Sequence, residues 1–476
     1  MKTCPRFEDF FESFWSFEKD HGLFDWKIGD AYPWDYILSS VYYDICHKIG
    51  LIQVQPAPKK TAYDRFRKVL SRMVFSITRN PVVNASGKDI LFMGNSRRKR
   101  LQDGRYYDIY SDFFIDDLPF SYEYFHADTI PLTGYDTKTK SIKTLDYLYL
   151  GSFFHKLFKG RRLGPKDMHK IKSLSESFIL EYGADPCLME KVQNLMEQRL
   201  GYEWIAKRLL DTYRPKMVVE TISKSVLTGV LNEECRRREI PTVELQVCEM
   251  SPIHIDYNFP DLDRKVTNAP DYILLFNSVS DRRINLPVDE DKAIVTGFPY
   301  FDDQYQRYKD MGKKDRIVVV SQWTYGKQLS DLALDISKRT DGFEVVFKLH
   351  PAESGDWQGR YPQLVDSDIR VVGDQIPLYE LLGSSKALVG VYSTVLGEGI
   401  AFNMKVYLYD IDGTAWFDYL VDMGYAKVIG DAGELVADLD KDAGSRSGRR
   451  YYRENAKKNI IDAISGIIAK EGPADA

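Results

Sequence analysis

The sequence predicts an α/β fold with two parallel-sheet domains and a helical extension at the N-terminus. Residues 343–410 alternate short apolar runs with helical patterns, and residues 215–247 show the same alternation earlier in the chain. Short runs rich in β-branched residues, alternating with helices, are typical of buried strands in parallel sheets. The 476 residues are enough for two such domains and an extension.

The composition is that of an ordinary globular protein, with 44% hydrophobic and 28% charged residues. A net charge of −5 argues against a nucleic-acid-binding protein, because such proteins are usually basic. The five cysteines form no C-x-x-C pair, which indicates reduced thiols in a cytoplasmic protein. The first residues show no signal-peptide pattern, and no run of about 18 apolar residues predicts a membrane span.

Residues 1–80 precede the first clear strand, and we expect them to form a helical extension. Residues 7–24 place Phe and Trp side chains largely on one side of a helix. Residues 34–50 predict a second helix and residues 61–78 a third. The extension could cap the first domain, bind an acceptor, or lie on a membrane surface. We favour the cap, since large aromatic residues at helical spacing are usually core.

Residues 81–300 are expected to form the first parallel-sheet domain. The apolar run KDILFMG predicts its first buried strand, and the unit at 215–247 reads as strand, helix and strand. The basic run at 97–100 is a solvated face or, at a strand end, a binding surface for an anionic acceptor. Further strands are expected at 106–114, 128–134, 270–277 and 292–302. Helices are expected at 145–160 and 166–210, the second of them broken near residues 183–186.

Residues 316–430 are expected to form the second domain, after a linker at 301–315. Its first strand is the run RIVVV, and the later strands are expected at 343–349, 368–373, 386–391 and 405–410. Residues 431–476 predict C-terminal helices, one of which can cross back to the first domain. In parallel sheets of this kind, ligands bind at the carboxyl ends of the strands.

Two strand ends of the second domain carry residues suited to an anion. His350-Pro351 follows one strand, and Ser393-Thr394 lies between another strand and a helix. Hydroxyls and free N–H groups at a helix start favour a phosphate, and a histidine donates a hydrogen bond to it. Glu398, about one turn further on, can accept hydrogen bonds from a ribose diol. The alternative is that these residues bind no ligand: His350-Pro351 would then be an ordinary turn, and Ser393-Thr394 an ordinary helix N-cap.

The loop after the first strand of the second domain adds small hydroxyl side chains to the same edge. Ser321, Thr324 and Lys327 lie there, ahead of the helix expected at 327–339. Such a loop suits a diphosphate or a leaving phosphate, and its alternative is an ordinary helix cap. The pair Gly326-Lys327 is not a P-loop, because the spaced glycines are absent.

The motif KLHP, followed by a strand that ends in Ser-Thr, resembles the HP and Ser-Ser/Thr motifs of bacterial sialyltransferases, polysialyltransferases and Kdo transferases. It is similar also to the CDP-glycerol glycerophosphotransferases. The resemblance covers roughly residues 215–430. It implies a GT-B fold, in which two Rossmann-like domains face each other across a cleft, and a transferase without metal or cofactor. It also implies that His350, Ser393 and Thr394 hold the donor's phosphate, with its base near residues 371–380.

The general base of the reaction is less well marked. Sialyltransferases of this group carry it in a D/E-D/E-G motif, which this sequence lacks. Many related transferases have a Gln-His-Gly motif where Val247 and Cys248 replace the His-Gly here. The loop that follows contains the candidates Glu249, His254 and Asp256.

Together these patterns predict a cytoplasmic glycosyltransferase, free or peripheral at the inner face of the membrane. It would move a sugar from a nucleotide-sugar donor, with a CMP-sugar favoured, to a saccharide or glycolipid acceptor in bacterial surface polysaccharide or lipooligosaccharide synthesis. Nucleic acid is not an expected partner. One alternative is a CDP-glycerol-type transferase that attacks at phosphorus. Another is a non-catalytic sugar-binding scaffold of GT-B shape.

Overall fold

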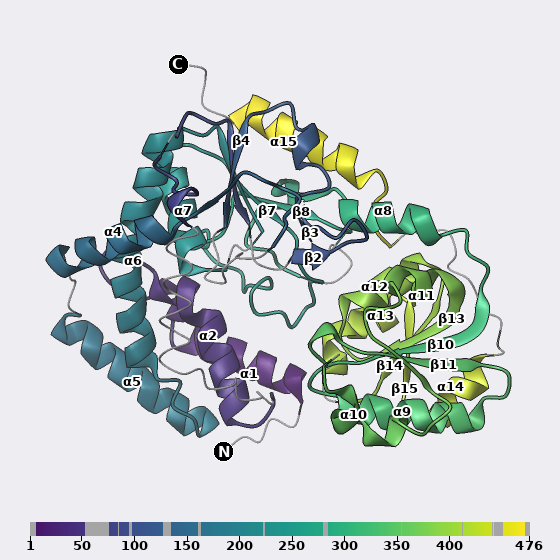
Figure 1. Cartoon of the computed structure of the whole chain (residues 1–476). Helices are drawn as coiled ribbons and strands as arrows, with labels where there is room; N and C mark the ends of the chain where they lie inside the picture. The colour runs from purple at the N-terminus through teal and green to yellow at the C-terminus, as the bar shows by residue number, and fades with distance from the viewer. Residues whose placement is uncertain are drawn as a thin grey trace.

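The computed structural model of the chain (Figure 1) describes most of its length. The described ranges are 6–52, 76–83, 85–94, 98–126, 135–159, 163–221, 224–278, 284–353, 355–411, 413–439, 441 and 451–471. The helices are α1 (Phe7–Asp20), α2 (Pro33–Lys48), α4 (Asp146–Lys159), α5 (Pro165–Tyr182), α6 (Leu188–Tyr213), α7 (Val226–Arg237), α8 (Pro299–Tyr308), α9 (Gly326–Arg339), α10 (Trp357–Arg360), α11 (Leu378–Ser384), α12 (Thr394–Ala401), α13 (Asp418–Asp422), α14 (Ala432–Leu439) and α15 (Ala456–Glu471).

The first domain is built on a parallel sheet with helices on both faces. In the described part of the chain its strand order is β5-β4-β1-β6-β7-β8-β9, so the chain starts in the middle, runs to one edge and returns to build the other half. Most of these strands are buried along their length, which explains their continuous apolar runs. They are β1 (Ile90–Gly94), β4 (Tyr122–His126), β5 (Ile142–Thr144), β6 (Met217–Glu220), β7 (Thr242–Leu245), β8 (Tyr272–Leu275) and β9 (Ala293–Val295).

The second domain repeats this plan with the strand order β12-β11-β10-β13-β14-β15, counted over the described residues. This is the order of a doubly wound Rossmann-like sheet, and it reverses between β10 and β13. The two sheets confirm the predicted α/β fold of GT-B type, with its helical N-terminus. The strands are β10 (Lys314–Val320), β11 (Glu344–Lys348), β12 (Arg370–Val372), β13 (Ser385–Gly390), β14 (Lys405–Tyr409) and β15 (Ala426–Ile429).

Several predicted segments differ in the structure. Residues 106–114 are strand only at β3 (Tyr106–Asp108), which pairs antiparallel with β2 (Arg98–Arg100) in a separate ribbon. Residues 301–315, expected as a linker, begin as helix α8 and end in β10. Pro at the start of α8 fits the first helical turn, where no N–H is needed. The strand at 128–134 and nearly all of the helix at 61–78 lie outside the described residues.

The C-terminal helices divide between the two domains. Helix α15 lies over the first sheet, with Ile460, Ile464 and Ile467 in the same core cluster as the β1 residues Ile90 and Phe92. Figure 1 shows it as the yellow helix beside the teal strands, far along the chain from them. Helix α14 instead packs on α9 in the second domain. The chain therefore returns to its first domain at the end, which ties the two domains together.

The helical extension is larger than residues 1–80. Helices α1 and α2 share one core with α5 and the start of α6, and we call these four helices the N-terminal helical unit. Aromatic rings fill this core; Phe14 stands edge-on to Tyr42 at 5.1 Å between centroids, and Phe17 contacts Phe178 at 4.3 Å. No helix in the described ranges has the length and apolarity needed to cross a membrane.

One carboxyl group is buried in that aromatic core. Glu18 is 1% exposed, and its Oε1 accepts a hydrogen bond of 2.6 Å from the indole N–H of Trp34. Its Oε2 has no partner among the described residues. Burial disfavours the charged form and raises the pKa of Glu18 to about 8, although the Trp34 hydrogen bond opposes the shift.

Glu18→Gln should therefore flatten the pH dependence of stability. The unfolded chain releases this proton near pH 4.5 and the folded chain keeps it to about 8, so stability falls as pH rises between them. The slope is at most about 1.4 kcal/mol per pH unit for one group. Urea unfolding at pH 6 and 8 should show a smaller loss for Glu18→Gln than for the wild type. The exposed Glu12→Gln serves as control, and equal losses in all three proteins would contradict the assignment.

Candidate functional site

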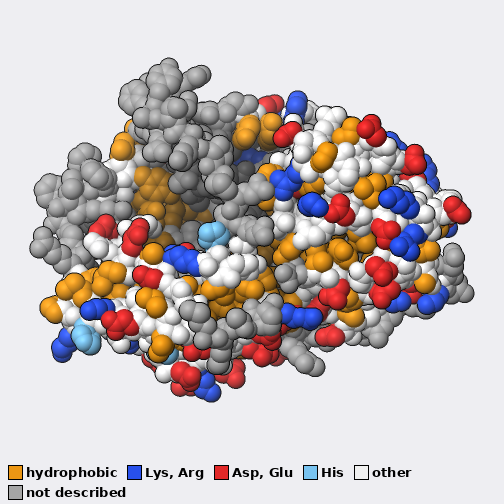
Figure 2. Space-filling view, turned by 90° about the horizontal axis from the view of Figure 1, so that it is seen from below, with side chains coloured by type: hydrophobic (Ala, Val, Ile, Leu, Met, Phe, Trp, Pro, Cys, Tyr) orange, Lys and Arg blue, Asp and Glu red, His pale blue; other side chains and the backbone are white. Residues whose placement is uncertain are grey.

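A cavity of about 970 Å³ lies where the two domains and the N-terminal helical unit meet. Figure 2 shows a hollow on this face of the molecule, with hydrophobic side chains on its walls. The second domain lines it with residues that follow β10 and β13, the first domain with the loop after β7, and the helical unit with residues of α1 and α2. Seven predicted site residues line it together: Glu249, His254, Asp256, Thr324, Lys327, Ser393 and Thr394.

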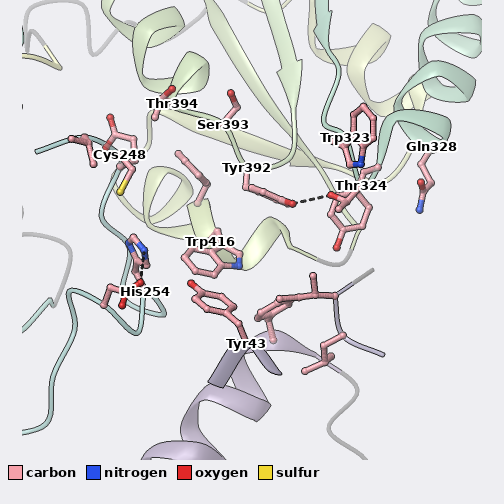
Figure 3. A pocket seen from close by; sticks show the side chains of 18 of the residues that line it. Tyr43, Cys248, His254, Trp323, Thr324, Gln328, Tyr392, Ser393, Thr394 and Trp416 are labelled. Carbon is pink, nitrogen blue, oxygen red and sulfur yellow. Dashed lines mark hydrogen bonds and ion pairs between the residues drawn. The ribbon is translucent and has the colours of Figure 1, made fainter. Parts of the chain in front are cut away.

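The second-domain wall is formed by the starts of two helices, α9 after β10 and α12 after β13. These strands flank the point where the strand order reverses, which is where open parallel sheets bind ligands. Ser393 caps α12, since its hydroxyl accepts a hydrogen bond of 3.3 Å from the N–H of Val395. The hydroxyls of Thr324 and Tyr392 bond to each other at 2.8 Å (Figure 3). The N-termini of two helices at one cavity create a positive electrostatic potential there, which favours the binding of an anion.

An arginine that the sequence analysis missed adds a cation to this wall. Arg360 lines the cavity, and its guanidinium lies 4.1 Å from the ring centroid of Trp323. It also donates to the hydroxyl of Tyr361 at 3.0 Å. Ser321, by contrast, is buried beneath the cavity, 3.2 Å from the same hydroxyl, and does not line it. Arg360 comes from the short helix α10, away from any strand end, so no strand-end motif marks it in the sequence.

His350 follows β11 on the neighbouring side of β10, outside the lining of this cavity. Pro351 begins the 3-10 turn η5 (Pro351–Glu353), and this turn fixes the histidine from both sides. The N–H of His350 donates to Glu353 at 3.0 Å, and the N–H of Ala352 donates to His350 Nδ1 at 3.2 Å. Because Nδ1 accepts, Nε2 carries the proton of the neutral ring and is the donor. Desolvation lowers the pKa of His350, although Glu353 opposes the shift.

Glu398 lies inside α12, 7% exposed and also outside the cavity lining. The hydroxyl of Tyr379 donates to its Oε1 at 2.9 Å, and its Oε2 has no partner among the described residues. Burial raises the pKa of Glu398 to about 7, while Tyr379 and Lys99 oppose the shift. A buried carboxylate oxygen without a partner is costly, so a ligand hydroxyl is a natural partner for it.

Lys99, on the strand β2 of the other domain, lies close enough to act electrostatically on this carboxylate. Its Nζ lies 5.3 Å from the ring centroid of Tyr300 and 5.7 Å from that of Tyr379. Burial lowers the pKa of Lys99, and the charges of Glu398 and Asp374 oppose the shift. The basic run at 97–100 is thus more than a solvated face, because one of its members lies at the interface between the domains.

The three base candidates occupy different environments. Glu249 is buried, and three hydroxyls hold its carboxylate: Tyr452 at 2.8 Å, Tyr451 at 3.3 Å and Tyr419 at 3.4 Å. These tyrosines belong to the second domain and the C-terminal segment, so Glu249 joins the domains. These three hydroxyls occupy the carboxylate oxygens of Glu249 and leave less room for an acceptor hydroxyl to approach them.

His254 and Asp256 lie together on the loop after β7, with His254 Nε2 3.9 Å from Asp256 Oδ2. The Nδ1 of His254 is buried and has no hydrogen-bond partner among the described residues, and burial lowers the pKa of His254 to about 4. The ring is therefore neutral at pH 7 and a weak base. Asp256 lines the cavity with 18% of its side chain exposed, and Ser39 of α2 donates to it at 3.3 Å. Of the three, Asp256 best combines access to the cavity with capacity to take a proton.

Within the described ranges, no cluster of three or more His, Cys, Asp or Glu side chains is arranged to hold a metal ion. Among the described residues, the cavity lining includes a cationic, N–H-rich wall on the second domain, and Asp256 and Lys224 on the first.

Comparison with known proteins gives a likeness of fold. No family model matches the chain. No curated protein matches it in sequence. The UDP-GlcNAc 2-epimerase of Methanocaldococcus jannaschii matches over 79% of this chain and 99% of its own, with 10% identity and a TM-score of 0.49. The Neisseria meningitidis enzyme bound to UDP-GlcNAc matches over 79% and 99%, with 13% identity and a TM-score of 0.45.

The wall teichoic acid polymerase TagF, soaked with CDPG, matches over 86% of this chain and 99% of its own, with 12% identity and a TM-score of 0.38. Two of these solved structures are UDP-GlcNAc 2-epimerases, and the third is a wall teichoic acid polymerase. At such identities and scores the likeness concerns the course of the chain and gives no activity for this protein.

Proposed function

We propose that this protein is a glycosyltransferase that moves a sugar from a nucleotide-activated donor, with a CMP-sugar as the first donor to test, to a saccharide acceptor in bacterial surface polysaccharide or lipooligosaccharide synthesis. The observation that carries the proposal is one cavity with two chemically opposite walls. The starts of α9 and α12 offer N–H groups and hydroxyls on one wall, and Asp256 offers a carboxylate on the other. A leaving phosphate and an acceptor hydroxyl need these two environments.

In this proposal the donor lies on the second domain. Its phosphate accepts hydrogen bonds from His350 Nε2 and from the Ser393-Thr394 helix start, and Glu398 binds the ribose. Asp256 takes the proton from an acceptor hydroxyl, whose oxygen then bonds to the anomeric carbon. The bond from that carbon to the phosphate oxygen breaks, and the nucleotide leaves with the electron pair. Its growing negative charge is stabilised by donors already in place, which is the main contribution to such catalysis.

Product analysis tests the proposal against its alternatives. Mass spectrometry of an acceptor incubated with CMP-, UDP- and GDP-sugars and with CDP-glycerol should show a gain of one sugar residue and no phosphorus. A phosphodiester product from CDP-glycerol would overturn the glycosyltransferase reading in favour of attack at phosphorus. If the protein neither hydrolyses nor transfers any of these donors, the non-catalytic scaffold would be the remaining interpretation.

The affinity for nucleotide should rise with pH through the pKa of Glu398. Above about pH 7 this carboxylate is charged and accepts the ribose hydroxyls more strongly, whereas below it the group is protonated. Calorimetry with CMP at pH 6 and 8 should show a larger gain in affinity for the wild type than for Glu398→Gln. Ionisation of the CMP phosphate affects both proteins equally, so the difference isolates Glu398. Identical pH dependence in the two would remove Glu398 from the ribose site.

A further inference from the structure

The N-terminal helical unit forms one wall of the cavity, although residues 1–80 were expected chiefly as a cap. Phe7 of α1, Tyr43 of α2, and Leu51 and Ile52 after α2 all line it. Trp416 of the second domain completes this wall, with Phe7 edge-on to its ring at 6.1 Å between centroids. Figure 3 shows Tyr43 rising from α2 below Trp416, on the side of the cavity away from Ser393 and Thr394. We call Tyr43 and Trp416 the aromatic platform.

The platform differs in chemistry from the opposite wall. Both of its rings are partly exposed, which a purely structural core contact does not require. Neither the hydroxyl of Tyr43 nor the indole N–H of Trp416 makes a hydrogen bond within the described part of the chain. The cations Lys327 and Arg360 line the second-domain wall, and Lys224 of the first domain also lines the cavity, with its Nζ 5.0 Å from the ring centroid of Tyr257. The platform therefore offers the apolar faces of two rings, together with a hydroxyl and an indole N–H that make no hydrogen bond to the described residues.

The platform also lies against the residues that would handle the acceptor's proton. His254 stands edge-on to Trp416, with ring centroids 5.2 Å apart, and no described residue bonds to its buried Nδ1. The same histidine is 3.9 Å from Asp256, which Ser39 of α2 also contacts at 3.3 Å. The helix that supplies Tyr43 thus also supports Asp256.

We propose that the aromatic platform is the acceptor subsite and that it binds a pyranose ring of a saccharide acceptor. A pyranose has an apolar C–H face, which packs on an aromatic ring, and a rim of hydroxyls, which suits the polar tips of Tyr43 and Trp416. A ring placed there directs a hydroxyl to Asp256. The inference rests on the proposed glycosyltransferase function, and it gives the N-terminal helical unit a substrate-binding role.

Saturation-transfer NMR on the full chain tests the subsite, with saturating CMP present. The probes are methyl glycosides of glucose, galactose, mannose and N-acetylglucosamine, and octyl β-D-glucoside below its micelle concentration. Saturation should reach the ring protons of at least one probe in the wild-type protein. Tyr43→Leu and Trp416→Leu, which keep apolar volume without an aromatic face, should each weaken that binding about tenfold.

Trp15→Ala is the matched control, because Trp15 is a partly buried aromatic of the same helical unit that does not line the cavity. It should lower thermal stability and leave saturation transfer unchanged. Absence of saturation at every ring would overturn the proposal, as would equal binding in all variants. If saturation reaches only the octyl chain, the subsite would bind a lipid chain and the sugar-binding proposal would be wrong. Calorimetry with CMP on the same samples separates the two ideas: CMP binding without sugar binding overturns the subsite only, and loss of both overturns the proposed function.

Discussion

Replacement of His350 by alanine should lower the turnover of sugar transfer at least about a hundredfold. Removal of one hydrogen-bond donor that stabilises negative charge in the transition state usually has an effect of about this size. The turn η5 orients this ring before any substrate arrives, since the Ala352 N–H fixes Nδ1 as the acceptor and leaves Nε2–H as the donor. Alanine removes that donor and leaves the backbone bond from residue 350 to Glu353 in place. Turnover is measured by release of nucleotide from the donor.

His169→Ala is the control for this experiment, because His169 is an exposed histidine on α5 that does not line the cavity. It should retain wild-type turnover, and both variants should keep the wild-type melting temperature. If His350→Ala is folded and has a near-normal rate, His350 does not bind the donor phosphate as proposed.

Asp256→Asn should cost about 10²–10⁴ in turnover, because a general base contributes about that factor. Asparagine keeps the shape of the side chain and can still accept from Ser39, but it cannot take a proton from the acceptor. Nucleotide affinity should stay unchanged, since the donor binds to the opposite wall. Steady-state kinetics with calorimetry on the same preparation gives both quantities.

Asp261→Asn controls for the loss of one charge on the same loop, since Asp261 is exposed and does not line the cavity. It should behave like the wild type. If Asp256→Asn also keeps its rate while Glu249→Gln loses it, the base would be Glu249, and the tyrosine contacts of that carboxylate would have to open during the reaction.

The fold could be predicted from the sequence where the strands are deeply buried. Strands β10 and β11 contain the buried runs IVVV and VVF, which are apolar and rich in β-branched residues because helices cover both faces of the sheet. The sequence analysis missed β2, β4, β5 and β15. Strand β4 mixes Glu and His with its aromatics, and β15 is a half-exposed edge strand of four residues. Neither carries the continuous apolar signal by which buried strands are recognised.

The site could be predicted where residues follow strand ends, as Thr324 and Ser393-Thr394 do. The aromatic platform could not, because Tyr43 lies on a helix of the extension and Trp416 in the 3-10 helix η7 (Thr414–Phe417). Only the tertiary packing of the helical unit against the loop after β7 brings these side chains to the cavity. Large aromatics at helical spacing predict core, and most of those on α1 are core.

Calorimetric titration of CMP, CDP, UMP, UDP and GDP into the wild-type protein and His350→Ala tests the central claim most directly. The account predicts that a nucleotide binds to the wild type, with CMP preferred, and that the variant loses most of this affinity. Preference for UDP or GDP would be consistent with a nucleotide-sugar enzyme, but the donor would then be a UDP- or GDP-sugar and not a CMP-sugar. A wild-type protein that binds none of the five nucleotides would contradict the account.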